Sequence, residues 1–204
     1  MEPTEQTMES EGAVRQRLLT VALELFTRKG YATTTVREIV AAAGVSKPVL
    51  YYYFKNKEGI YLELMTGTFA IFQGILHGLG ETKGPAQGRI TRFATMIFDG
   101  FVDNLEVMRL IYAIFFGPPQ GAPDFPHDQY FTTMLVVVAA MVEEGIAAGE
   151  FRQVEKGDVA WTVVSCMHTV MEEQLCHNPP RVDRERLAAM VDLVLDGIVK
   201  GGRA

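Results

Sequence analysis

The 204-residue sequence lacks the marks of a membrane or secreted protein. Its longest uncharged apolar run, MLVVVAAMV at 134–142, is about half of the roughly 20 residues that span a bilayer. The first residues, MEPTEQTMESEG, are acidic and polar, without the basic and apolar segments of a signal peptide. We therefore expect a cytoplasmic protein that does not bind membranes, with residues 1–11 forming a disordered leader.

Cysteine and catalytic motifs are also scarce. Cys166 and Cys176 are ten residues apart on one expected helix, roughly 15 Å along its axis and too far for a disulfide. There is no glycine-rich phosphate loop, nucleophile elbow or histidine-rich metal pattern. His168, Glu172 and Cys176 recur at every fourth position, but the first and last are roughly 12 Å apart and cannot share one ion. We expect no metal, no cofactor and no enzymatic activity.

The overall charge of −6 conceals an asymmetry along the chain. Residues 13–60 carry eight Lys or Arg against three Glu, a net charge of 8 − 3 = +5. Residues 61–204 carry eleven Lys or Arg against eighteen acidic residues, a net charge of 11 − 18 = −7. A basic segment joined to an acidic body suggests that the first quarter of the chain meets a polyanion, although a solvated basic surface explains the same count.

Apolar residues recur at helical spacing almost throughout, and no alternating strand pattern is present, which predicts an all-α fold of about nine helices. A long helix ends at Gly30, after a basic last turn. Thr35 and Glu38 form a capping box that starts a short helix ending at Gly44. Ser46 offers an N-cap for a third helix that ends at Phe54, and Pro48 fits its first turn. Later helices are expected near 57–79, 86–104, 106–116, 127–148, 157–177 and 183–200.

Residues 12–56 therefore have the arrangement of a helix-turn-helix domain, with the motif itself over 35–54. Leu50 and Phe54, at i and i+4, define the inward face of the third helix, which leaves Tyr52 about 180° away and Tyr51 and Tyr53 on its flanks. Phenol hydroxyls donate to phosphates, and ring edges pack on thymine methyl groups. Double-stranded DNA is therefore the partner that best explains three tyrosines on one short helix, while packing against neighbouring helices remains an alternative for Tyr53.

Other residues near these helices suit the same partner. Lys47, Lys55 and Lys57 bracket the third helix and can neutralise phosphates. Thr34, Thr35 and Ser46 lie at helix N-termini, where hydroxyls and free amides favour an anion.

The segment LLTVALELFTRKGYATTTVREIVAAAGVSKPVLYYYFKNKEGIYLELM at 18–65 closely resembles the DNA-binding domain of TetR-family transcriptional regulators. The resemblance rests on A-x-x-L-F-x-x-x-G-Y, T-T-x-x-x-I, A-G-V-S and L-Y-x-Y-F-x-x-K, and it implies a homodimer that reads successive major grooves of a palindromic operator. It also implies that residues 57–204 form a helical domain for effector binding and dimerisation. Transferred by position, the family's DNA contacts fall on Thr34, Thr35, Ser46, Lys47, Pro48, Tyr51, Tyr52, Tyr53 and Lys57.

Two positions depart from the family pattern. Position 48 is often glycine, whereas Pro48 has no N–H and can make only van der Waals contact there. Position 40 is valine where alanine is common. Because the reading surface also lacks Arg, Asn and Gln, we expect phosphate contacts and DNA shape to contribute heavily, with Lys47 and apolar contacts giving most direct readout.

The C-terminal body is rich in aromatic residues and methionine. Most of these form the core, but a subset is expected to line a pocket for an uncharged or long-chain effector. The candidates are Met65, Phe69, Phe72, Phe93, Met96, Met108, Tyr112, Phe115, Trp161, Met167, His168 and Met171. The last two helices carry apolar stripes that are candidates for the dimer interface, at Val164, Leu187, Val191, Val194, Leu195 and Ile198.

The sequence thus predicts a ligand-responsive, sequence-specific DNA-binding regulator, most often a repressor in the family it resembles, released from a palindromic operator by a small apolar effector. Two alternatives remain. One is an architectural DNA-binding protein without an effector, whose helical interior would contain no cavity. The other is a helical enzyme or carrier whose tyrosines face a substrate.

Overall fold

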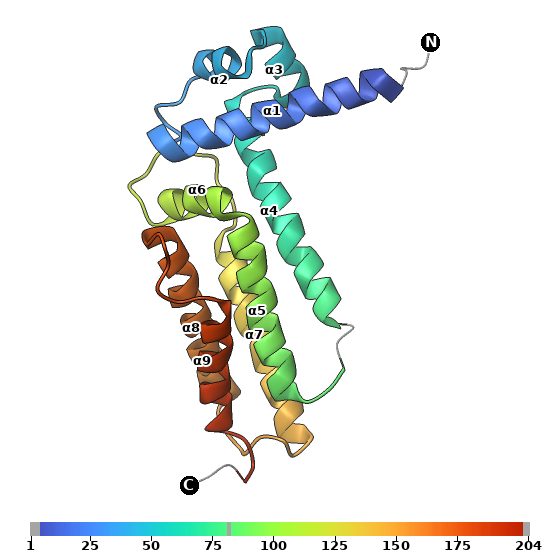
Figure 1. The fold of residues 1–204 in the computed structure, drawn as a ribbon, viewed down its shortest axis with the longest axis vertical. Coiled ribbons are helices and arrows are strands. Elements are labelled where there is room, and N and C mark those ends of the chain that lie inside the picture. Colours follow the sequence, from blue (N-terminus) through green and yellow to red (C-terminus); the bar gives the residue numbers. More distant parts are fainter. Residues whose placement is uncertain (1–4, 81–82, 202–204) are drawn as a thin grey trace. The chain divides into compact units, whose positions relative to one another are not determined.

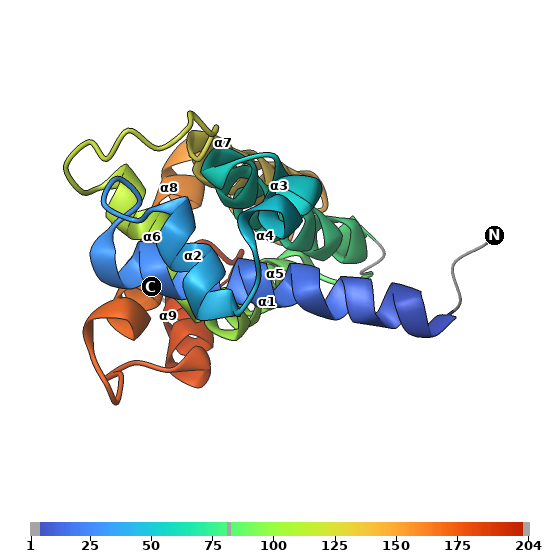
Figure 2. The ribbon, with the colours of Figure 1, turned by 90° about the horizontal axis from the view of Figure 1, so that it is seen from above.

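The computed structural model describes residues 5–80 and 83–201 (Figures 1 and 2). These residues form nine helices joined by loops, so the predicted all-α fold is confirmed. The helices are α1 (Glu5–Lys29), α2 (Val36–Ala43), α3 (Lys47–Phe54), α4 (Lys57–Gly80), α5 (Ala86–Asp103), α6 (Leu105–Phe115), α7 (Asp128–Ala147), α8 (Lys156–Cys176) and α9 (Arg184–Asp196).

Two ends differ from the sequence-based expectation. Residues 1–4 of the expected disordered leader lie outside the described residues, and residues 5–11 form the first turns of α1. The last helix ends at Asp196 instead of residue 200. Beyond it, Val199 forms an isolated antiparallel bridge with Phe151.

The chain divides into two compact units, and their residue ranges differ from those of the predicted domains. The N-terminal unit contains the chain up to Phe69 and also Glu106–Phe125, so the start of α4 and most of α6 belong with the helix-turn-helix. The C-terminal unit comprises Ala70–Leu105 and the chain from Pro126 onward. The chain therefore passes from one unit to the other within α4, returns at the start of α6 and leaves again after Phe125.

The core of the N-terminal unit joins α1, α2 and α3 to the beginning of α4 and to α6. Leu18, Phe26, Ile39 and Leu50 are at most 1% exposed, because each lies on the apolar stripe of its helix. Burial of side chains of this size stabilises the fold by about 1.5–3 kcal/mol each.

The C-terminal unit contains the end of α4 and a bundle of four helices, α5, α7, α8 and α9, that pack against one another (Figure 1). Glu150 lies in the loop after α7 and caps α5, because its carboxylate accepts hydrogen bonds from the N–H groups of Ala86 at 2.6 Å and Gln87 at 2.9 Å. Gln87 in turn donates to Asp196 of α9 at 2.8 Å.

Two helices, Lys57–Leu79 within α4 and α7, have the length and composition to cross a membrane, which the sequence analysis did not anticipate. In each, 28% of the most apolar 18 residues are buried inside the structure, and core helices of soluble proteins have the same length and composition.

Candidate nucleic-acid interface

Helix α3 has a buried side and an exposed side, as predicted. Leu50 and Phe54 are 0% and 4% exposed, whereas Tyr52 is 72% and Tyr51 47% exposed. Tyr53 is half-buried, with its ring 5.0 Å from that of Tyr52 in an edge-on contact and 6.2 Å from that of Phe54. The three tyrosines therefore present two exposed phenol rings and a third that supports them.

The first turn of α3 is also exposed. Ser46 occupies the N-cap with an extended backbone, but its hydroxyl makes no capping hydrogen bond. Lys47 and Pro48 follow and are exposed. Because a proline in the first turn removes an N–H that has no helical partner, Pro48 starts the helix at no cost in hydrogen bonds.

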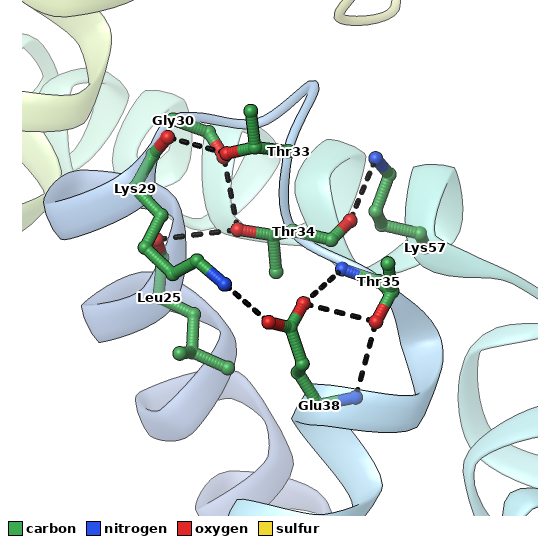
Figure 3. Close-up of polar contacts among 8 residues, drawn as sticks. All are labelled: Leu25, Lys29, Gly30, Thr33, Thr34, Thr35, Glu38 and Lys57. Carbon is green, nitrogen blue, oxygen red and sulfur yellow. Dashed lines mark hydrogen bonds and ion pairs between the residues drawn. The ribbon is translucent and has the colours of Figure 1, made fainter.

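The capping box predicted at the start of α2 is present (Figure 3). The Glu38 N–H donates to the Thr35 hydroxyl oxygen at 3.3 Å, and the Glu38 carboxylate accepts from the Thr35 N–H and hydroxyl, each at 2.9 Å. Lys29, in the last turn of α1, also pairs with this carboxylate. The hydrogen bond from Lys29 and those from Thr35 lower the pKa of Glu38 to about 2.

Thr34 does not face solvent, which corrects its place among the expected DNA contacts. Its side chain is 1% exposed, and its hydroxyl lies within hydrogen-bonding distance of the carbonyl oxygens of Gly30 at 2.9 Å and Leu25 at 3.2 Å (Figure 3). Thr34 therefore joins the turn to the end of α1, and its hydroxyl points away from any phosphate outside.

Lys57 was expected to contact a phosphate, but its side chain forms hydrogen bonds inside the domain. Its ammonium donates to the carbonyl oxygens of Tyr31 at 2.7 Å and Thr34 at 3.0 Å, and lies 4.1 Å from the centroid of the Tyr31 ring. Burial lowers the pKa of Lys57, since it removes water from the charged form.

The link between α3 and α4 has a local structure that was not predicted from the sequence. Lys55 has a positive φ of 62°, a conformation that disfavours a residue with a side chain. Asn56 accepts a hydrogen bond from the Gly59 N–H at 2.7 Å and so caps α4. A Cβ atom at Gly59 would lie 2.0 Å from the Phe54 carbonyl oxygen, so only glycine permits this approach. The sequence N-K-E-G at 56–59 was the available signal, because Asn is a favoured N-cap.

The expected effector-pocket residues fall into both units. Met65, Phe69, Met108, Tyr112 and Phe115 belong to the N-terminal unit, and the others belong to the C-terminal unit. Met65, Phe93 and Met167 are fully buried, whereas Phe115 is 50% and Trp161 55% exposed. Their placement does not define a single set of lining residues.

The predicted dimer interface is mostly internal to the chain, which is a correction. Five of its six candidates, Val164, Leu187, Val191, Leu195 and Ile198, are at most 7% exposed, because this stripe forms the core of the C-terminal unit. Val194 is half-buried and lines a hollow of about 410 Å³ together with Val159 and Thr162 of α8. Leu193, which was not a candidate, is 75% exposed.

Glu173, near the end of α8, is paired with two basic side chains. Glu173 accepts hydrogen bonds from the Arg181 guanidinium at 2.7 and 2.8 Å and lies 3.1 Å from Nδ1 of His177. The Arg181 hydrogen bonds lower the pKa of Glu173 to about 2.

Comparison with known proteins agrees with this geometry. Residues 18–64 match the profile of the bacterial regulatory proteins of the tetR family. The HTH-type transcriptional activator FasR of Mycolicibacterium smegmatis is 30% identical over 156 residues, which cover 76% of this chain and 71% of FasR. The chain belongs to the TetR family. The relatives that it matches are named HTH-type transcriptional regulators or activators.

Two further proteins are similar over most of this chain. The uncharacterized HTH-type transcriptional regulator YerO of Bacillus subtilis is 21% identical over 191 residues, which cover 92% of this chain but 65% of YerO. The chain therefore spans less than two thirds of that relative. The solved complex of SmeT with triclosan has a TM-score of 0.69 at 17% identity and covers 93% of each chain, which shows that the fold is shared.

Proposed function

We propose that this TetR-family protein is a repressor that binds a palindromic operator as a homodimer and is released by a small apolar effector in the cytoplasm. The observation that carries the proposal is the exposed side of α3, where Tyr51 and Tyr52 stand beside Lys47 and Pro48. A helix that faced only water would gain nothing from this apolar and aromatic surface.

The chemistry of this surface suits DNA more than any other partner. Tyrosine hydroxyls and the Lys47 ammonium donate to phosphate oxygens, while the rings and Pro48 offer apolar contact to thymine methyl groups. Ser46 adds an exposed hydroxyl at the start of α3, whereas the Thr35 hydroxyl is engaged in the capping box of α2. Arginine, asparagine and glutamine are absent from this surface, so we propose that phosphate contacts and DNA shape provide much of the operator preference.

Dimerisation is proposed through the exposed side of α8 and α9. Leu193 is the most exposed large apolar side chain of α9, and Val194 adjoins the hollow shared with Val159 and Thr162. A second copy would cover these residues and would place two α3 helices on one palindrome, as the twofold symmetry of such an operator requires.

The effector is proposed to bind within the C-terminal unit, between helices whose interior is lined by large apolar side chains such as Phe93, Met167 and Met171. The resemblance to a regulator solved with triclosan supports a small organic ligand. Release requires that the effector bind the non-DNA-binding conformation more tightly than the DNA-binding one.

The test begins with selection of a duplex from random sequence by the wild-type protein, followed by affinity measurements over a salt series. We expect a palindromic consensus and an affinity that falls steeply with salt, because phosphate contacts release counterions. A non-palindromic, salt-insensitive interaction would contradict the proposal. A reporter placed behind the selected operator then distinguishes repression from the activation for which FasR is named.

A further inference from the structure

In the turn between α1 and α2, the backbone of Tyr31 forms hydrogen bonds with two side chains from outside the turn. The Tyr31 N–H donates to Oε1 of Gln120 at 2.8 Å, and the Tyr31 carbonyl accepts from the Lys57 ammonium at 2.7 Å. Neither partner belongs to the helix-turn-helix, since Lys57 is the first residue of α4 and Gln120 lies in the loop after α6. We name Tyr31, Lys57 and Gln120 the turn clamp.

The side chain of Tyr31 is closely packed between neighbouring aromatic rings. Its side chain is 6% exposed, and its ring lies 5.2 Å from the rings of Phe26 and Tyr61. Gly30 has a positive φ of 86°, and a Cβ atom there would lie 2.7 Å from Oε1 of Gln120. The glycine thus gives the turn its conformation and also leaves room for the Gln120 side chain.

The turn clamp has a consequence for the DNA-reading helices. Lys57 also holds the carbonyl of Thr34, which directly precedes the N-cap of α2, and Lys57 itself follows α3 by only three residues. These hydrogen bonds therefore close a loop that contains α2 and α3, and Gln120 attaches the base of that loop to Glu106–Phe125. The chain enters and leaves Glu106–Phe125 from the C-terminal unit.

We propose that Gln120 and Lys57 are positioning residues that set the orientation of α2 and α3 for operator binding. The segment after α6 then provides a second route, besides α4, by which the C-terminal unit controls DNA affinity. This inference rests on the proposed function, because it presupposes that α3 reads an operator.

The alternative role for Lys57 is a direct phosphate contact, and salt dependence separates the two. Loss of a phosphate contact lowers the slope of log affinity against log salt by about 0.9 for each contact. Loss of a positioning residue weakens binding but leaves the number of released counterions unchanged. Lys47, which is exposed on α3, provides the matched lysine control.

The experiment compares Gln120→Leu, Gln120→Glu, Lys57→Met and Lys47→Met with the wild type on one selected operator duplex over a salt series. We expect Gln120→Leu and Lys57→Met to bind roughly tenfold more weakly with an unchanged slope, as for loss of about one hydrogen bond to a charged or buried group. Gln120→Glu keeps the acceptor for the Tyr31 N–H and should bind within about threefold of the wild type at high salt. Lys47→Met should lower the slope by about 0.9 per subunit.

Amide hydrogen exchange at Tyr31 shows whether a folded Gln120 variant has lost the hydrogen bond from the Tyr31 N–H. Faster exchange in Gln120→Leu together with wild-type operator affinity would overturn the proposal, because the contact would then be structural only. A lowered slope in Lys57→Met would overturn its positioning role in favour of a phosphate contact. If Gln120→Leu fails to fold, Gln120→Asn, whose shorter side chain moves the acceptor away, takes its place with the same expected loss. Absence of operator binding by the wild type would refute the proposed function itself.

Discussion

Helices α3 and α9 each bury one side and expose the other, but their exposed sides differ in kind. α3 exposes phenol rings beside Lys47, so its surface has donors and positive charge. α9 exposes Leu193, a side chain with no polar atom. The surface of α3 therefore suits a partner that has both phosphates and bases, such as DNA. Leu193 is stabilised by a partner whose apolar surface removes it from water. This difference supports the two separate interfaces that we propose, one for DNA and one for a second copy of the chain.

The largest expected effect comes from the buried side of α3. Phe54→Ala removes a ring that is 4% exposed and packs near Arg15, whose guanidinium lies 5.6 Å from the ring centroid. We expect a loss of about 3–5 kcal/mol in the free energy of unfolding, measured by urea denaturation. Tyr52→Ala, on the opposite side of the same helix, should stay within about 0.5 kcal/mol of the wild type. Equal losses in the two variants would contradict the division of α3 into two sides.

The exposed side of α9 is tested by Leu193→Asp. A carboxylate at the centre of the proposed interface loses its water on association, so the dimer dissociation constant should rise about 100-fold, as measured by analytical ultracentrifugation. The variant should keep its unfolding free energy per monomer, because Leu193 is 75% exposed. Glu185→Gln, in the first turn of α9, is the control and should remain dimeric. An unaltered dimer in Leu193→Asp would place the interface elsewhere.

Tyr52→Ala should act on DNA binding alone. Removal of a ring that is 72% exposed should weaken operator binding about tenfold, the magnitude of one contact to a base or phosphate. Fluorescence anisotropy with the selected duplex measures this loss, and the melting temperature and dimer affinity should not change. A loss of dimerisation in Tyr52→Ala would join the two interfaces that we separate.

The smallest effect concerns two carboxylates that accept hydrogen bonds from basic side chains, Glu38 in α2 and Glu173 near the end of α8. Hydrogen bonds from Lys29 and from Arg181 hold the two pKa values at about 2, below the unfolded value near 4.3. Their contribution to stability is therefore present above about pH 4.5 and is lost as the pH falls towards 2. The difference in melting temperature between the wild type and Glu38→Gln or Glu173→Gln should shrink over this range. A constant difference would contradict the assigned charge state.

The sequence predicted α3 in detail because its two sides follow from geometry alone: residues four apart share a side, and Tyr52 lies between Leu50 and Phe54. The capping box of α2 was equally local. Thr34 and Lys57 could not be placed this way, because their partners are the carbonyls of Leu25, Gly30 and Tyr31, which only the folded domain brings near.

The residues of the dimer interface were predicted incorrectly for a different physical reason. Leu187, Val191 and Leu195 form a stripe at helical spacing, and such a stripe predicts burial without indicating whether the chain itself or a second copy provides the cover. Leu193 lies off that stripe, so its position was the signal of a second apolar side. Gln120 gave no signal at all, since nothing in a Pro- and Gly-rich loop indicates a contact with a turn 89 residues away.

Our central claim is that the exposed side of α3 reads the DNA. Hydroxyl-radical footprinting of the selected duplex with the wild type and Tyr52→Ala tests it most directly. We predict two protected regions about 34–36 Å apart for the wild type, one for each subunit of the dimer. Both should nearly disappear with Tyr52→Ala at a protein concentration equal to the wild-type dissociation constant, because a tenfold weaker variant then occupies about 9% of the duplex instead of about 50%. A footprint that Tyr52→Ala leaves unchanged would contradict this assignment.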